Sequence, residues 1–75
     1  MAANEELSVF AQRLKQLRQR RRISRIVLSE LCGLHRNAVS RYERGTMPSF
    51  DSLIAIADFF GVSTDYLLGR DSYDT

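Results

Sequence analysis

Polar and basic side chains gather in one short stretch of the chain, HRNAVSRYERG, at residues 35–45. If this stretch is helical, Val39 and Tyr42 lie on its inner side and the polar residues lie on its outer side. Arginine can bind guanine through two hydrogen bonds, asparagine can bind adenine in the same way, and serine can contact either base. The stretch therefore predicts a helix that faces the DNA major groove with Arg36, Asn37, Ser40, Arg41 and Arg44.

The segment before this helix predicts a tight turn between two helices. A preceding helix is expected from Ser24, a good N-cap, to Gly33, because glycine readily takes the left-handed conformation that often follows a helix end. The next helix is expected to begin near His35 or Arg36, which leaves a residue or two of connection. Helices joined so closely cross at a steep angle, as in a helix-turn-helix.

Three further helices are predicted around this pair. Apolar residues at helical spacing indicate a first helix, and serine caps followed by glycine stops indicate a fourth and a fifth. These helices should cover about 7–21, 49–61 and 64–68. Their apolar faces comprise Leu7, Phe10, Leu14 and Leu17 in the first helix and Phe50, Leu53, Ile56, Ala57 and Phe60 in the fourth. We expect one all-α domain over residues 1–75, with no strand, a flexible arm at 1–6 and a flexible tail at 70–75.

Composition argues against several classes of protein. The single cysteine, Cys32, cannot form an internal disulfide, and nothing in the 75 residues resembles a signal peptide, so none is expected. No apolar run approaches the roughly 18 residues that a membrane span requires. One histidine, one cysteine and no phosphate-binding glycine loop argue against an enzyme. We therefore expect a cytoplasmic protein without a catalytic residue, metal, cofactor or small-molecule ligand.

Positive charge is concentrated in the middle of the chain. The net charge is only +2, but ten of the 11 Lys and Arg residues lie between Arg13 and Arg44 with two acids, which makes this segment +8. From Gly45 onward there are five aspartates and Arg70. This asymmetry suits a polyanionic partner, and a solvated basic face without a partner is the alternative.

Taken together, these features resemble the phage-repressor and Cro-type helix-turn-helix regulators, also called the xenobiotic-response-element family. The resemblance covers roughly residues 10–69, and it depends on the order and spacing of many residues rather than on one. Its marks are Leu17-Arg18, Ile23-Ser24, Leu28, Gly33, Val39-Ser40-Arg41, Glu43-Arg44-Gly45, Pro48-Ser49, Phe60-Gly61-Val62-Ser63 and Leu67-Leu68. The resemblance implies a compact, lambda-repressor-like domain of bacterial or phage origin.

The resemblance also implies roles for particular residues. Arg36, Asn37 and Arg41 match positions that contact bases in similar proteins, and Arg44 matches a phosphate contact. Arg25 matches another phosphate position, where the family usually has glutamine. We add Thr46 and the cluster Arg20-Arg21-Arg22 as phosphate contacts, although the cluster could equally be a solvated helix end.

Arg18 and Glu43 match residues that form an ion pair in similar proteins. Glu43 lies on a very basic helix, where an unpaired, half-buried charge would be costly. The alternative is an exposed acid that reduces local repulsion. His35 replaces the usual serine or threonine cap, and it either contacts phosphate or has no role. Ser29 replaces a small alanine, and Cys32 replaces a core leucine and is interpreted as a small hydrophobic residue.

Three apolar residues, Ile26, Val27 and Leu31, occupy positions where the family generally has polar ones. They could contact the first helix or the N-terminal arm, or they could form a surface for a partner protein. The expected function is a sequence-specific regulator of transcription that binds a double-stranded operator, with repression as its action. The alternative is a protein-interaction module, such as the antitoxin of a toxin–antitoxin pair.

A homodimer on a palindromic site is expected, because one small domain buries little surface on DNA. Ile54, Phe59 and Tyr66 are candidates for the dimer surface, although these side chains could instead close the core. The chain could be a complete regulator or the DNA-binding part of a longer one.

Overall fold

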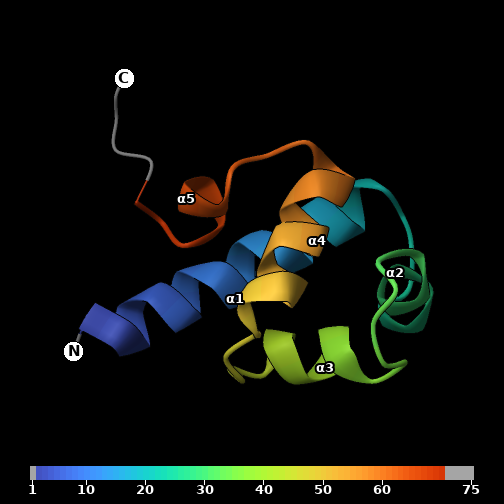
Figure 1. Ribbon diagram of the computed structural model, residues 1–75, viewed down its shortest axis with the longest axis horizontal. Helices are drawn as coiled ribbons and strands as arrows, with labels where there is room; N and C mark the ends of the chain where they lie inside the picture. The colour runs from blue at the N-terminus through green and yellow to red at the C-terminus, as the bar shows by residue number, and fades with distance from the viewer. Residues whose placement is uncertain (1, 71–75) are drawn as a thin grey trace.

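The computed structural model describes the backbone of residues 2–70 and the side chains of residues 5–70, and this part of the chain forms five α-helices and no strand (Figure 1). The helices are α1 (Ala2–Arg20), α2 (Arg25–Leu31), α3 (Ala38–Glu43), α4 (Phe50–Phe60) and α5 (Thr64–Leu67). The all-α fold with five helices is therefore confirmed. Residue 1 of the expected arm and residues 71–75 of the expected tail lie outside the described residues.

Serine side chains begin three of the helices, as their positions predict. The hydroxyl oxygens of Ser24, Ser49 and Ser63 accept hydrogen bonds from the backbone N–H groups three residues later, which start α2, α4 and α5. Each bond satisfies an N–H group that has no partner within its helix. At the other end of α4, Gly61 has φ +69° and closes the helix in the left-handed conformation.

Helix α1 begins five residues earlier than the apolar stripe predicted. It starts at Ala2 instead of near Leu7 and so includes most of the expected arm. Alanine and glutamate favour helix at these positions, and Glu5 in the first turn complements the helix dipole. In the next turn, Glu6 forms an ion pair of 3.3 Å with Arg70, which joins α1 to the C-terminal end of the described chain.

Helix α3 begins later than expected, at Ala38 and not near His35 or Arg36. The residues before it form a turn, in which the N–H of Ala38 donates to the backbone oxygen of His35 at 2.8 Å. The N–H of Asn37 donates to Nδ1 of the His35 ring at 3.1 Å. The first i→i+4 hydrogen bond of the helix is donated by the N–H of Arg41 to the oxygen of Asn37 at 3.1 Å, so the regular helix starts only after Asn37.

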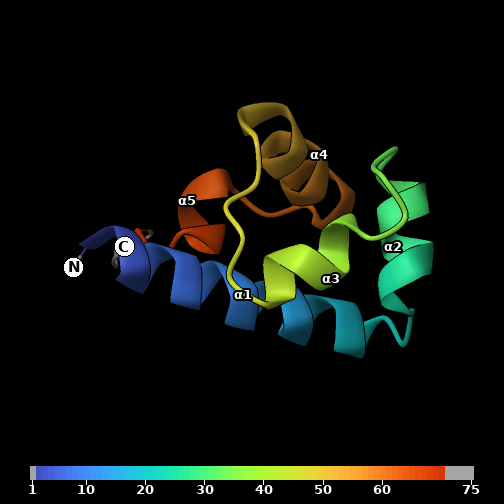
Figure 2. The same cartoon turned by 90° about the horizontal axis from the view of Figure 1, so that it is seen from below.

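Helix α1 is the longest element, and the core lies between it and the other helices (Figure 2). The core side chains come from all five helices: Phe10, Leu14, Leu28, Ala38, Val39, Tyr42, Ile56, Ala57, Phe60 and Leu67. The prediction that Phe50 belongs to the apolar face of α4 was wrong, because 74% of its surface is exposed. As the first residue of α4, Phe50 lies beyond the edge of this core, whereas Ile56 and Phe60 reach its interior.

None of the helices in residues 2–70 has the length and apolar character needed to cross a lipid bilayer.

Candidate nucleic-acid interface

Helices α2 and α3 form a helix-turn-helix, as predicted from Gly33. Figure 2 shows the two helices running in clearly different directions, with a short connection between them. Gly33 has φ +71°, a conformation that a side chain would strain, and its N–H donates to the oxygen of Glu30 at 3.0 Å. The next residue, Leu34, donates its N–H to the oxygen of Ser29 at 2.8 Å and packs against the core.

A buried hydroxyl joins the two helices. Ser29 on α2 is fully buried, and its Oγ donates to the backbone oxygen of Arg25 at 2.8 Å. The same Oγ accepts the backbone N–H of Val39 at 3.1 Å. Val39 is the second residue of α3, so this N–H group has no partner within its own helix. From the sequence, Ser29 was interpreted only as a small residue, and this bond was not predicted. A hydroxyl-bearing residue at the position where the two helices meet was the feature that could have indicated it.

The far end of α3 is held by one carboxylate between two arginines. Glu43 Oε2 lies 2.7 Å from Arg18 Nε, and Glu43 Oε1 lies 3.2 Å from Arg18 Nη2. Arg18 also donates through Nη1 to the oxygen of Ile23 at 3.0 Å. Arg25 Nε donates to Glu43 Oε1 at 3.0 Å. The resemblance pairs Arg18 with Glu43, whereas the contact of Arg25 was not foreseen.

Burial distinguishes the two arginines. The side chains of Arg18 and Glu43 are 10% and 5% exposed, while that of Arg25 is 49% exposed. The pair formed by Arg18 is therefore shielded from solvent, and Arg25 adds a second positive charge at the surface. Together with the Ser29 hydroxyl, this cluster fixes both ends of α3 relative to α1 and α2.

The outer side of α3 is turned to solvent. Ala38, Val39 and Tyr42 are buried on the inner side of the helix. The predicted base-contacting residues Arg36, Asn37 and Arg41 are all exposed, and Ser40 is half-buried between the two sides. Because α3 starts at Ala38, Arg36 and Asn37 extend from the turn before the helix, and the Asn37 side chain makes no capping hydrogen bond to it.

The predicted phosphate-contacting residues lie next to the ends of α2 and α3 in the sequence. Arg44 and Thr46 follow the C-terminus of α3, His35 lies in the turn before it, and Arg22 and Arg25 lie on either side of the start of α2. All five side chains are exposed. The Nε of Arg25 is occupied by Glu43, and Nδ1 of His35 accepts the Asn37 N–H.

The arginines of the cluster Arg20-Arg21-Arg22, at the end of α1, do not share the same surroundings. Arg21 lies over the rings of Phe59 and Phe60, with its guanidinium carbon 5.3 and 5.2 Å from the two ring centres. This position places Arg21 against the end of α4. Arg20 is the last residue of α1 and is exposed.

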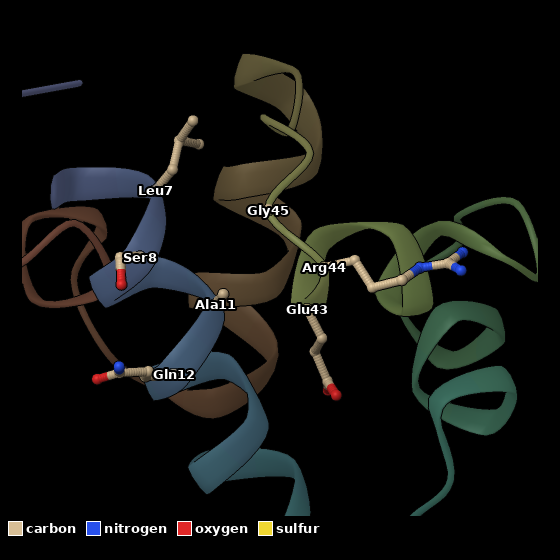
Figure 3. A pocket seen from close by; sticks show the side chains of 7 residues that line it. All are labelled: Leu7, Ser8, Ala11, Gln12, Glu43, Arg44 and Gly45. Atoms are coloured by element: carbon tan, nitrogen blue, oxygen red, sulfur yellow. The ribbon is translucent and has the colours of Figure 1, made fainter. Parts of the chain in front are cut away.

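A hollow lies between α1 and the end of α3 (Figure 3). It is lined by Leu7, Ser8, Ala11, Gln12, Glu43, Arg44 and Gly45. Figure 3 shows the Arg44 side chain projecting away from Ser8 and Gln12. Arg44 is therefore directed outward and does not close this hollow.

Two of the three residues considered for a dimer surface are partly covered. Phe59 meets Phe60 edge-to-face with ring centres 5.0 Å apart, and it packs against the core. Tyr66 also packs against the core, the guanidinium of Arg13 lies 4.3 Å from its ring centre, and Arg13 Nη1 donates to its backbone oxygen. Ile54 alone of the three is exposed.

Ile26, Val27 and Leu31 are 40%, 41% and 58% exposed. A large part of each side chain is therefore open to solvent, and the two interpretations, contact with the first helix or N-terminal arm and a surface for a partner protein, both stay predictions. Cys32 is half-buried and packs against the core, and this burial raises the pKa of its thiol. A raised pKa keeps the thiol neutral, which agrees with its interpretation as a small hydrophobic residue.

Comparison with known proteins agrees with this geometry. A sequence profile of the helix-turn-helix family matches residues 14–67. The chain is 38% identical over 63 residues to the HTH-type transcriptional regulator ImmR of Bacillus subtilis (strain 168), a match that covers 83% of this chain and 50% of that protein. It is 34% identical over 62 residues to the uncharacterized HTH-type transcriptional regulator YobD of the same organism, which covers 81% of this chain and 55% of YobD. The chain thus spans about half the length of these curated relatives.

Among solved structures, the fold matches the P22 c2 repressor protein in complex with synthetic operator 9T. The TM-score is 0.76 at 30% sequence identity, and the match covers 83% of this chain and 96% of the repressor chain. The segment that the family profile matches, residues 14–67, includes all of α2 and α3 and therefore the exposed polar face. The chain therefore belongs to the helix-turn-helix family of Cro and phage-repressor type.

Proposed function

We propose that this chain is a sequence-specific, double-stranded DNA-binding regulator of transcription that acts as a repressor. The observation that carries the proposal is the outer face of α3 and of the turn before it. Asn37 and Arg41 are exposed there, while Val39 and Tyr42 are buried behind them. The likeness to HTH-type transcriptional regulators and to a repressor bound to an operator supports the same function.

In the proposed mechanism, two groups of residues have separate tasks. Arg22, Arg25, Arg44 and Thr46 contact phosphates and place the domain on the duplex. Arg36, Asn37, Ser40 and Arg41 then contact base edges in the major groove. The bonds from Ser29 and Glu43 hold α3 in one position, so little conformational freedom is lost when the reading face meets DNA.

Binding as a homodimer to a palindromic operator is part of this proposal. A single domain of this size covers only one half-site, and a two-fold pair would add the binding energy of the second half-site. Ile54 is the exposed candidate for contact between the two copies, since Phe59 and Tyr66 pack against the core of their own chain. Sedimentation of the wild type and of the Ile54→Lys variant tests this assignment, which predicts a smaller dimer fraction for the variant.

A protein-interaction module is the second candidate, and the exposure of Val27 and Leu31 on α2 favours it. In that case the apolar residues would bind a protein partner, and DNA binding would be secondary.

Selection of bound oligonucleotides from a random duplex pool, followed by gel shifts at several salt concentrations, tests the proposal. A repressor of this kind enriches one sequence, and its binding to that sequence weakens as salt rises. Arg70→Ala is a suitable control, because it removes one positive charge at the ion pair with Glu6, outside the helix-turn-helix. If no sequence is enriched and no salt-dependent binding occurs, the interaction module replaces the regulator.

A further inference from the structure

Ile26 lies at the interface between α2 and the proposed reading residues. A hollow in the surface is lined by Ser24, Arg25, Ile26, Arg36, Asn37 and Ser40. Its polar lining comes from the start of α2, from the start of α3 and from the turn before α3, and Ile26 is its one large apolar side chain. The residue is 40% exposed and does not belong to the core or to the hydrophobic residues packed against it.

The surroundings of Ile26 differ from those of its two apolar neighbours. Val27 is exposed to nearly the same extent, at 41%, and Leu31 is exposed more, at 58%. Neither of them lines the hollow that contains Asn37 and Ser40. The three residues look like one apolar group in the sequence, but in the structure Ile26 lines the hollow and the other two do not.

The DNA major groove offers one apolar group that an apolar side chain can contact next to side chains that form hydrogen bonds. The thymine base offers a C5-methyl group next to its O4 acceptor, and the adenine paired with it offers N6 and N7. Asn37 carries the amide that suits adenine, and Ile26 on the same hollow carries an alkyl group that suits the methyl. Isoleucine is branched at Cβ and therefore stiff, so it loses little rotamer freedom in such a contact.

We propose that Ile26 determines sequence specificity by contacting the C5-methyl group of a thymine in the operator half-site. This inference rests on the proposed function, because it requires the hollow to face the major groove. It assigns direct base contact to α2 as well as to α3. It also gives Ile26 a role distinct from that of Val27 and Leu31.

Replacement of thymine by deoxyuridine tests the contact, because it removes the methyl group and leaves base pairing intact. Each thymine of the operator found by selection is replaced in turn, and the Kd of the wild type is measured. We expect one thymine in each half-site whose replacement weakens binding about fourfold, the effect of burying one methyl group. In Ile26→Ala, the thymine and deoxyuridine operators should bind equally at that position.

Val27→Ala is the matched control, since it shortens a neighbouring apolar side chain of the same exposure and should keep the fourfold difference. Ile26 is outside the core, so Ile26→Ala should keep the helical circular dichroism of the wild type. The inference is overturned if no thymine shows the methyl effect, or if Ile26→Ala retains it. If either result is found with an operator that was enriched by selection and binds in a salt-dependent way, the proposed function remains. If no operator is enriched at all, both the proposed function and the role of Ile26 are overturned.

Discussion

The backbone N–H of Val39 in α3 donates to the hydroxyl of Ser29 in α2 at 3.1 Å, in a part of the domain that is fully buried. The hydroxyl itself donates a hydrogen bond to the backbone oxygen of Arg25, so both the Val39 N–H and the Ser29 hydroxyl have partners. This bond connects the first turn of the proposed reading helix directly to the helix before it. The position of the exposed face therefore depends on a side chain that does not itself reach the surface.

Ser29→Ala should lower the free energy of unfolding by about 1–3 kcal/mol, because the buried N–H of Val39 loses its partner. Urea denaturation of the wild type and the variant measures the change. Ser8→Ala, an exposed substitution in α1, is the control and should change stability by less than about 0.5 kcal/mol. Equal stability of Ser29→Ala and the wild type would show that the hydroxyl contributes nothing.

Glu43→Gln should destabilise the domain by about 3–5 kcal/mol, because the buried guanidinium of Arg18 is left without an opposite charge. Arg25→Ala removes an exposed contact to the same carboxylate and should cost about 1 kcal/mol or less. Thermal unfolding of both variants gives the comparison. The double variant Arg18→Met/Glu43→Leu should recover much of the lost stability, since neither charge then remains buried. A larger loss for Arg25→Ala than for Glu43→Gln would contradict this assignment.

Asn37→Ala and Arg41→Ala should each weaken binding to the selected operator by about 1–3 kcal/mol and change binding to random duplex little. The reason is that both side chains are exposed on the reading face and have no part in the core. Competition gel shifts with the operator and with random DNA provide the two affinities. Equal losses on both kinds of DNA would mean that this face does not read sequence.

Arg44→Ala should weaken binding to operator and random duplex alike, because a phosphate contact carries no sequence information. The slope of log K against log salt should become smaller by about one. Arg70→Ala is the control: it also removes one positive charge, but from the ion pair with Glu6, and it should leave the slope unchanged. An unaltered slope in Arg44→Ala would exclude this residue from the phosphate contacts.

Many of the helix boundaries could be predicted from the sequence, because they depend on neighbouring residues. Ser24, Ser49 and Ser63 each satisfy an N–H group three positions away, so residue type and spacing were sufficient to place these caps. The start of α3 could not be predicted in the same way. A tight turn precedes it, closed by a hydrogen bond from the Ala38 N–H to the His35 oxygen at 2.8 Å, and residue preferences do not specify this turn.

Side-chain surroundings were predicted less well than the helices. Phe50 has the spacing of a core residue, yet its position at the start of α4 leaves it exposed. Phe59 and Tyr66 have the size of interface residues, yet the guanidinium groups of Arg21 and Arg13 lie over their rings. For each of these residues, the exposure of the side chain depends on which segment, distant in the sequence, packs against it.

The sequence by itself determined the helix-turn-helix and the polar residues that it carries, because turns, caps and helical faces follow from residues a few positions apart. Only the tertiary structure decided that Arg25 joins the Arg18–Glu43 pair, that the Ser29 hydroxyl accepts the N–H of Val39, and that Ile26 shares a hollow with Asn37. These contacts join residues ten or more positions apart. Their distances depend on how α1, α2 and α3 pack against one another, which local spacing does not specify.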